Sequence, residues 1–534
     1  DVYKRQMHEA LGIDASVNRM TPDDLISAIL RAPVDLLWNG GIGTYVRATS
    51  ETDAQVGDRA NDPVRVTAKE VRAKAAGEGG NLGWTQAGRI EYARNGGRIN
   101  TDFIDNSAGV DTSDHEVNIK ILLDAEVAAG RISEQERDKL LPAMADDVAS
   151  LVLRHNHSQN LALANALSSD GPTAGVLEAW MCELEESGHL DRAVDTMPST
   201  TEMNRRMAAG ERLASPELCT LLAWTKIALC DAVLATDLPE DPFVADRLVG
   251  YFPPLLRERF AERMPTHRLH REIITTEAVN RFVDSQGITA YYRLHLQTGA
   301  DIAQVIRCQL AARSVFGLGR VETDLTHLGL DAVRTAKIRF ALTDLAMHAT
   351  RWFLNHGGAD DIAGTIETYR PGVATLVEKL SERLLGDSAD AWQEKVDEVT
   401  ELGLDRSDAA VVAAYDWSPV LLSIVEISEE GHPLDEVADA YLTLARRVDM
   451  IRLTRLVEQL PQDRPTDARV RASLREDLLR VMSDATRRAL VIGTDNVLAD
   501  GGRIVKSIAA NPDLAHCVVM VSDLRSAVGQ EVTL

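Results

Sequence analysis

The sequence predicts an α/β fold followed by a mostly α fold: part of a doubly wound, Rossmann-like parallel sheet, then a long helical domain. Three short apolar runs in the first part of the chain each end in a turn rich in glycine or asparagine, as buried parallel strands do. Helical patterns alternate with these runs, which is typical of βαβ units. From Ser133 onward, long segments of period 3.6 follow one another with few strand patterns.

The first predicted helix covers residues 21–32 and leads into the first strand. Thr21 can cap this helix, and Pro22 suits its first turn because proline has no N–H to leave unsatisfied there. Pro33 ends the helix. Val34–Trp38 is then a short apolar run of the kind that is buried in parallel sheets.

The second and third strands are predicted at Val71–Ala76 and Arg98–Ile104, with a helix between them at Thr85–Arg94. Three strands do not complete a doubly wound sheet, so we expect the remaining strands upstream. Ser113, followed three residues later by Glu116, has the pattern of a capping box and predicts the start of a long helix that ends at about Ala129.

A second capping box, Ser133 with Glu136, predicts a helix that reaches His155. Ser215-Pro216-Glu217 opens an apolar helix to about residue 235. An HCVVMV run at 516–521 is a possible strand. Further helices are predicted at 268–285, 301–314, 331–354, 373–385, 408–428, 434–447 and 467–490.

Length and pattern together predict the domain organisation. A chain of 534 residues is too long for one ordinary core. We expect residues 7–130 to be the carboxyl-terminal part of a dinucleotide-binding domain and residues 131–534 to be a helical region, with a possible subdivision near 355–360. Residues 1–6 (DVYKRQ) fit no element and are expected to be a non-native leader.

Composition excludes several classes of function. A net charge of −25 argues against nucleic acid as a partner, because nucleic-acid binders present a basic face. No membrane partner is expected, since no run has the roughly 18 consecutive apolar residues of a span. The five cysteines are far apart and form no CxxC pair, which fits reduced thiols in the cytoplasm.

The turns after the strands are the candidate binding residues. Glycines let a backbone approach a ligand closely, and turns on adjacent parallel strands meet at one sheet edge. The turn after the first strand contains Asn39, Gly40 and Gly41, and the next contains Glu78, Gly80 and Asn81. Asn81 is a possible partner for an amide such as nicotinamide, or simply a turn asparagine.

Two further positions complete this crevice. Asn106 follows the third strand at the same expected edge. Ser113 can cap its helix, and a ligand carboxylate could also lie at that helix terminus, where N–H groups and the dipole favour anions. Gly41-Ile42-Gly43-Thr44 resembles the start of a GxGxxG loop, but Val46 stands where the third glycine belongs, so a tight βα turn near a ligand is the preferred interpretation.

No metal site is predicted. His155 and His157 are two residues apart and point to different sides of a helix, while His267 and His270 share a face but lack an acidic or cysteine partner at ligand spacing.

At these residues the chain resembles the large bacterial NAD-dependent glutamate dehydrogenases. The matching stretches are APVDLLWNGGIGTYV, GEGGNLGWTQAGRIEYA and GGRINTDFIDNSAGVDTSDHEVNIKILL. The resemblance implies oxidative deamination of L-glutamate to 2-oxoglutarate and ammonia with NAD as the hydride acceptor, and a cytoplasmic homo-oligomer.

The resemblance also implies roles for single residues. Asn81 matches an asparagine near the nicotinamide ribose or amide, Asn106 the second asparagine of the cofactor crevice, and Ser113 a serine that meets the side-chain carboxylate of the substrate. The chain departs mildly from the pattern, with EGGN at 78–81 and Ala108 before Gly109.

No catalytic residue can be assigned on this chain. The catalytic lysine, the catalytic aspartate and the cofactor loop of the family belong upstream, so the chain is expected to be a carboxyl-terminal portion that is inactive alone. Two alternatives stay open: a dehydrogenase of another amino acid, and a non-enzymatic helical protein with an interaction or regulatory role.

Overall fold

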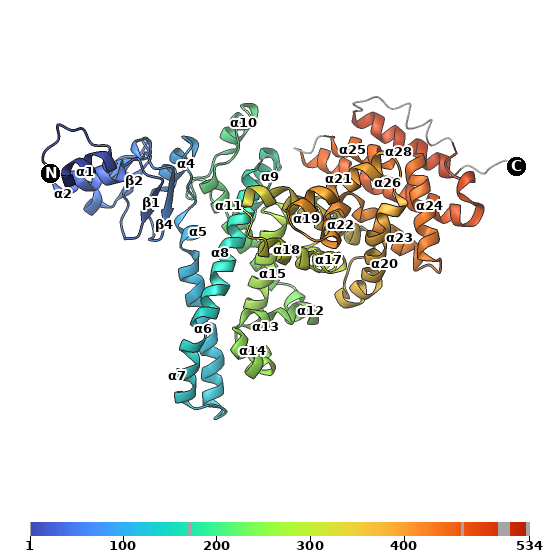
Figure 1. Cartoon of the computed structure of the whole chain (residues 1–534), viewed down its shortest axis with the longest axis horizontal. Helices are drawn as coiled ribbons and strands as arrows, with labels where there is room; N and C mark the ends of the chain where they lie inside the picture. Colours follow the sequence, from blue (N-terminus) through green and yellow to red (C-terminus); the bar gives the residue numbers. More distant parts are fainter. Residues whose placement is uncertain (1, 169–171, 461–463, 500–512, 530–534) are drawn as a thin grey trace. The chain divides into compact units, whose positions relative to one another are not determined.

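A computed structural model describes residues 2–168, 172–460, 464–499 and 513–529 of the chain. The chain divides into two compact units, Asp1–Ile288 and Thr289–Leu534. The first unit begins with α/β structure and continues as helices, and all named elements of the second unit are helical (Figure 1). The predicted fold class, α/β followed by mostly α, is confirmed at this level.

The first unit opens with its strands and short helices, and helix α1 includes residues 2–6, so the expectation that DVYKRQ fits no element is wrong. In chain order these are α1 Val2–Leu11, α2 Pro22–Leu30, β1 Leu36–Asn39, β2 Val46–Arg47, α3 Asp53–Val56, β3 Val66–Thr67, β4 Ala75–Glu78, α4 Gln86–Arg94 and α5 Asp102–Asp105. Its longer helices follow: α6 Ser107–Ala128, α7 Glu134–Ala143, α8 Ala145–Leu167, α9 Ala174–Glu186, α10 Thr200–Ala208, α11 Ser215–Leu234, α12 Pro242–Ala245, α13 Arg247–Tyr251, α14 Pro254–Phe260 and α15 His270–Gln286.

Two small parallel sheets form the α/β part. β1 pairs with β4, and β2 pairs with β3. A core that includes Val46, Val66, Ala76, Trp84 and Tyr92 fills the space beside them. The Trp84 and Tyr92 rings lie 5.0 Å apart between centroids, and α4 carries Tyr92 onto the strands. The predicted parallel pairing is therefore present, while a doubly wound sheet stays a prediction.

The second and third predicted strands are displaced. The second lies at Ala75–Glu78 rather than 71–76, because a 3-10 turn occupies Ala68–Glu70. The predicted third strand contributes one parallel bridge, Arg98 with Ala75, and then turns into α5. The reason is local: Thr101 takes up the N-cap position, and the following aspartates bond to the neighbouring turn instead of extending a strand.

Helix starts agree with the sequence prediction at two capped positions. Thr21 and Asp24 form a reciprocal capping box at α2, and the Ser133 hydroxyl accepts the N–H of Glu136 at α7. The single helix predicted over 133–155 is wrong, because α7 ends at Ala143 and α8 begins at Ala145. Pro142 has no N–H for the helical ladder, which explains the break.

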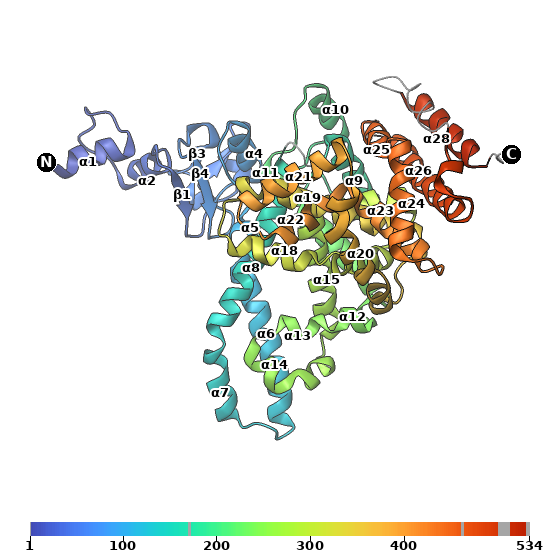
Figure 2. The ribbon, with the colours of Figure 1, turned by 45° about the vertical axis from the view of Figure 1, so that its right-hand side comes forward.

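The second unit consists of α16 Ala290–Thr298, α17 Ile302–Val315, α18 Leu318–His327, α19 Ala332–Asn355, α20 Ile362–Arg383, α21 Asp387–Glu401, α22 Arg406–Ala413, α23 Ser418–Ser428, α24 Leu434–Arg447, α25 Met450–Glu458, α26 Pro465–Ile492 and α28 Leu514–Gly529. Figure 2 shows α19, α20, α23 and α26 packed together as helices only. Trp352 lies in this core and donates to the Ser423 hydroxyl at 3.0 Å.

Three predictions in this unit are wrong. The single helix predicted over 408–428 is divided into α22, a 3-10 turn at Ala414–Trp417 and α23. Residues 516–521 are part of helix α28, not a strand, because the buried side chains Cys517, Met520, Val521 and Leu524 repeat at helical spacing. Helix α20 starts at Ile362, well before the predicted residue 373, and includes Pro371.

One described segment, 406–428, is long and apolar enough to cross a membrane by composition. It is divided into α22, a 3-10 turn and α23. Of its most apolar window, 61% is buried inside the protein, so it is weak grounds for a membrane span.

Candidate functional site

Two turns meet at the carboxyl edge of the β1–β4 pair. Asn39 and Glu78 are register partners, so both strands end at the same level. The N–H groups of Gly79 and Gly80 donate to the carbonyl of Asn39 at 2.8 and 3.0 Å. The strand order thus brings together the predicted crevice residues Asn39, Gly40, Gly41, Glu78 and Gly80.

The glycines of these turns are required by close packing of one turn on the other. A Cβ on Gly80 would lie 2.4 Å from the carbonyl oxygen of Gly41, and a Cβ on Gly83 would lie 2.1 Å from the amide nitrogen of Asn39. The first contact is with backbone, which cannot move aside, so Gly80 is required; the second could be relieved only by displacing the Asn39 side chain from its place in the crevice. Gly41 itself faces open space, since a Cβ there would meet no atom of the described residues within 4 Å.

The two predicted asparagines do meet. The side-chain N–H of Asn106 donates to the side-chain oxygen of Asn81. Asn106 reaches this position from the end of α5 rather than directly from a strand. One amide atom of each side chain is engaged in this bond, and Asn81 is exposed at the crevice.

Two aspartates that the sequence analysis missed hold the second turn. The Asp105 carboxylate accepts the N–H of Glu78 at 2.9 Å, and the Asp102 carboxylate accepts the N–H of Leu82 at 2.8 Å. Leu82 has a φ of +60°, which a residue with a Cβ rarely adopts. Burial raises the pKa of Asp105. Their spacing of three residues, at the end of the predicted third strand, was the available signal.

Glu78 lies beneath the turn as part of a buried ion pair. Its carboxylate accepts from Arg89 at 2.7 and 2.9 Å and from the N–H of Trp84 at 3.1 Å. Its side chain is fully buried. Burial raises the pKa of Glu78, and the Arg89 guanidinium opposes that shift. In this structure Glu78 anchors the crevice, and direct contact with a cofactor stays a prediction.

The predicted capping role of Ser113 is wrong. Helix α6 begins at Ser107 with Asn106 at the N-cap position, so Ser113 lies within the helix and cannot cap it. The expected anion site at a terminus beginning at Ser113 is therefore absent. Ser113 is exposed on α6, and its contact with a substrate carboxylate stays a prediction.

The Gly41-Ile42-Gly43-Thr44 turn leads into strand β2, so the preferred interpretation as a βα turn is wrong. The N–H of Thr44 donates to Asp58 at 2.8 Å, which directs the chain toward β2. Ile42 is 93% exposed.

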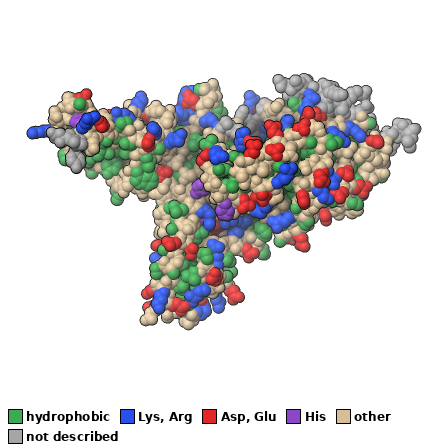
Figure 3. Space-filling model, viewed as in Figure 1, with side chains coloured by type: hydrophobic (Ala, Val, Ile, Leu, Met, Phe, Trp, Pro, Cys, Tyr) green, Lys and Arg blue, Asp and Glu red, His purple; other side chains and the backbone are tan. Residues whose placement is uncertain are grey.

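Apolar side chains are exposed around this sheet edge. Trp38 is 57% exposed, although it belongs to a strand that the sequence predicts to be buried. Figure 3 shows hydrophobic side chains gathered on the α/β part of the first unit. The exposed large apolar residues of this region are Leu36, Trp38, Ile42, Leu82, Phe103 and Val110.

The histidine pairs that the sequence excludes as metal sites have other partners. His157 is exposed. Ring nitrogen Nε2 of His267 lies 3.1 Å from the carbonyl oxygen of Asn118, and Nδ1 of His270 lies 2.9 Å from that of His267. His155 instead faces Asp111 on α6, a contact across two helices that spacing within one helix cannot reveal.

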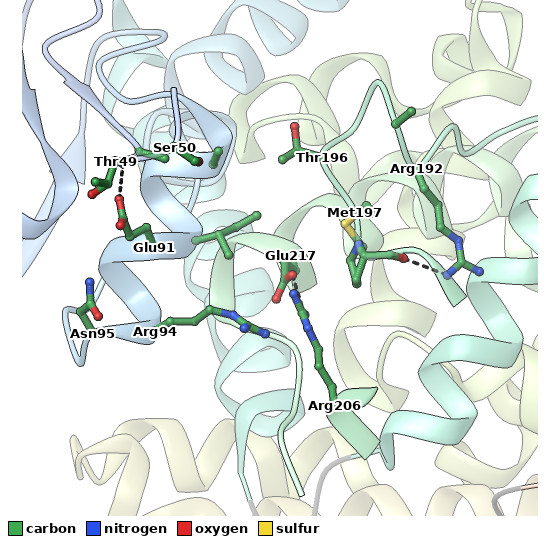
Figure 4. Close-up of a pocket in the computed structure, with 15 residues that line it drawn as sticks. Thr49, Ser50, Glu91, Arg94, Asn95, Arg192, Thr196, Met197, Arg206 and Glu217 are labelled. Carbon is green, nitrogen blue, oxygen red and sulfur yellow. Dashed lines mark hydrogen bonds and ion pairs between the residues drawn. The ribbon is translucent and has the colours of Figure 1, made fainter. Parts of the chain in front are cut away.

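A wide, open cavity of about 760 Å³ lies elsewhere in the first unit and is lined by residues from α4, α10, α11 and the 192–198 loop (Figure 4). Its cations are already paired: Arg206 with Glu217 at 2.7 Å and Arg192 with Glu178 at 2.8 Å. None of the predicted crevice residues lines it.

Residues 210–531 match the family described as "Glutamate dehydrogenase, C-terminal", and residues 2–166 match "Bacterial NAD-glutamate dehydrogenase, catalytic domain". Proteins named "NAD-specific glutamate dehydrogenase" are similar to the chain. The one from Mycobacterium tuberculosis is 40% identical over 91% of this chain, and the one from Pseudomonas aeruginosa is 38% identical over 98%. A third, from Halomonas elongata, is 36% identical over 92%.

The chain spans 30%, 32% and 30% of the length of these three relatives. The two family matches follow one another along the sequence and leave residues 167–209 between them unmatched. The chain therefore belongs to the bacterial NAD-dependent glutamate dehydrogenase family.

Proposed function

We propose that this chain supplies the cofactor-facing edge and one substrate contact of a dehydrogenase that converts L-glutamate to 2-oxoglutarate and ammonia with NAD. In this proposal residues 7–130 are the carboxyl-terminal part of the dinucleotide-binding domain and residues 131–534 are its helical extension. The β1–β4 pair is then the edge of a larger doubly wound sheet. The names of the relatives support glutamate and NAD.

The observation that carries the proposal is the convergence of three asparagine-bearing turns at one sheet edge. Ligands of open α/β sheets bind outside the carboxyl ends of the strands. Asn39 and Asn81 lie at such ends, and Asn106 bonds to Asn81. The buried amide nitrogen of Asn39 has no hydrogen-bond partner among the described residues. Neutral amide groups and glycine backbone fit an uncharged carboxamide and ribose.

The residues of the crevice divide the work of this mechanism into three tasks: holding the cofactor, fixing the turn and binding the substrate. NAD, when bound, would supply the hydride acceptor for the oxidation. Asn81 and Asn106, joined by their hydrogen bond, would hold the carboxamide of the cofactor. Asp102 and Asp105 fix the Asn81 turn by accepting its backbone N–H groups. The Ser113 hydroxyl donates to the side-chain carboxylate of the substrate.

Proton transfer is not assigned to any residue here. By family resemblance it belongs to a lysine and an aspartate outside this chain. A hydroxyl at Ser113 favours glutamate over leucine or phenylalanine, because an apolar substrate would leave a polar group unpaired.

We also propose a cytoplasmic location and a homo-oligomeric assembly. The five cysteines are all free thiols in the structure, which supports a reducing setting. The oligomer is proposed from the family resemblance alone.

The test is an activity assay on two proteins: the chain alone, and the chain joined to the upstream segment of the Pseudomonas aeruginosa relative. We expect glutamate-dependent NADH formation only from the joined protein. In it, N81A and N106A raise the KM for NAD, while S113A raises the KM for glutamate and lowers the ratio of glutamate to leucine turnover.

N95A, in an exposed turn after α4, is the matched control and should leave both KM values unchanged. Activity of the chain alone would refute its dependence on upstream catalytic groups. Unchanged KM values in N81A and N106A would refute the crevice.

A further inference from the structure

Helices α6 and α8 carry a cluster of possible metal ligands. Asp111 and His115 are four residues apart on α6 and therefore share a face. His155 comes from α8, which packs along α6. One ligand atom from each of the three side chains lies within 4.8 Å of the other two.

His115 is the side chain that requires explanation. It is completely buried, and neither of its ring nitrogens has a hydrogen-bond partner among the described residues. Its ring stacks on that of Tyr251 at 4.1 Å between centroids. An imidazole always carries at least one N–H or lone pair in need of a partner, and leaving it unsatisfied in the interior is unfavourable.

We propose that Asp111, His115 and His155 bind one divalent first-row transition-metal ion, with zinc as the candidate, and that this ion fastens α6 to α8. Two imidazoles and one carboxylate are a ligand set that such ions accept.

The distances suit an ion after small shifts. With bonds of about 2.0–2.1 Å, ligand atoms of a tetrahedral zinc lie about 3.3 Å apart. Nδ1 of His155 is 2.7 Å from one Asp111 oxygen, and Nε2 of His115 is 3.7 Å from the other. The two separations end on different oxygens of Asp111, so a carboxylate that binds the ion through one oxygen would turn to bring that oxygen near both histidine nitrogens.

A carboxylate also lies on the far side of His155. Nε2 of His155 is 3.8 Å from a carboxylate oxygen of the mostly buried Glu277 on α15, which is an ion-pair distance rather than a hydrogen bond. Metal-bound histidines usually donate their other N–H to such a group, so a small approach of Glu277 would hold the ring orientation. Glu277 is therefore a positioning residue rather than a ligand.

The proposed ion is structural. Ser113, the predicted substrate contact, lies two residues from both Asp111 and His115 and is exposed, so it points to the other side of α6. The site is thus independent of the proposed dehydrogenase function, and its test needs no activity measurement.

The test uses the full chain purified with Zn²⁺, freed of loose ions by gel filtration, and analysed by plasma mass spectrometry. We expect about one zinc per chain. D111N and H155A should lose this zinc and the rise in Tm that added Zn²⁺ produces. E277Q should weaken zinc binding by about 10–100-fold. H157A removes an exposed histidine two residues from His155 and is the matched control. It should retain both the bound zinc and the rise in Tm with added Zn²⁺.

The visible absorption spectrum of the protein loaded with cobalt(II) in place of zinc identifies the atoms that bind the ion. Visible d–d bands without thiolate charge-transfer bands are expected in the wild type and in H157A, and neither kind of band in D111N. Thiolate bands would place the ion at cysteines and overturn the proposal. Wild-type protein that takes up no zinc or cobalt, or variants that bind as much as wild type, would show that the cluster is only a hydrogen-bonded Asp–His pair.

Discussion

Arg89 is the residue that holds the two acids beneath the turn at residues 78–82. It is buried, it forms two hydrogen bonds to Glu78, and it lies 3.4 Å from Asp102. Through these two acids it supports both ends of the turn that presents Asn81. Removing one partner of a buried ion pair leaves an uncompensated charge in the interior, which is far more costly than losing a surface pair.

Arg89→Met should therefore lower the free energy of unfolding by about 3–5 kcal/mol. Urea denaturation at pH 7 measures the change. Lys74→Ala is the matched control, because its pair with Asp35 is exposed on both sides and should contribute nothing measurable. A loss in Arg89→Met no larger than that of the control would contradict the structural role of the ion pair.

The buried thiols should be inert at neutral pH. Burial raises the pKa of Cys219 to about 12 and that of Cys308 to about 12, and it raises that of the half-buried Cys230 to about 11. Only the thiolate form of a cysteine reacts with an alkylating reagent, so the rate of labelling increases with pH up to these pKa values.

Peptide mass spectrometry after iodoacetamide treatment should find Cys219 and Cys308 unmodified in the native protein at pH 8 and modified in urea. Labelling of Cys230 should rise about tenfold between pH 8 and pH 9, because the thiolate fraction increases by that factor below the pKa. Rapid labelling of Cys219 in the native protein at pH 8 would be inconsistent with its burial.

At the scale of the element, two serines with the same sequence motif have different positions. Ser133 caps α7, whereas Ser113 lies inside α6 because that helix has already begun at Ser107. Asn156 and Gln159 of α8 both donate to the Ser107 hydroxyl at 2.8 Å, so packing against α8 fixes the earlier start. The local motif cannot report this tertiary contact.

S133A should lower the free energy of unfolding by about 1 kcal/mol, as the loss of an N-cap does. S113A should change it by no more than about 0.5 kcal/mol, since alanine suits an exposed helix interior. Thermal and urea unfolding of both variants tests the pair. Equal destabilisation by the two substitutions would place the start of α6 at Ser113.

At the scale of the whole molecule, apolar residues are exposed at the α/β end of the first unit. Trp38 and Ile42 belong to the edge where the sheet has only two strands, and they are 57% and 93% exposed. Exposed apolar surface of this kind is typical of an interface. We expect it to be covered by a segment of the longer relatives that this chain does not span.

Hydroxyl-radical footprinting tests this expectation. Modification of Trp38, Ile42 and Leu82 should be strong in the chain alone and should fall to the level of the buried Trp84 in the chain joined to the relative's upstream segment. Trp84 is the internal control, since it is protected in the chain alone. Undiminished modification of Trp38 in the joined protein would contradict the interface.

The sequence by itself determined the parallel α/β character of the first part, the caps of α2 and α7, most long helices and the resemblance to the family. These depend on spacing, capping and turn residues, which act within a few positions of one another. Tertiary structure alone decided the early start of α6, the helical state of 516–521 and the reduction of the third strand to one bridge. It also decided that Asp111, His115 and His155 meet. These features depend on contacts between segments distant in the chain, where burial and hydrogen-bond satisfaction override local preference.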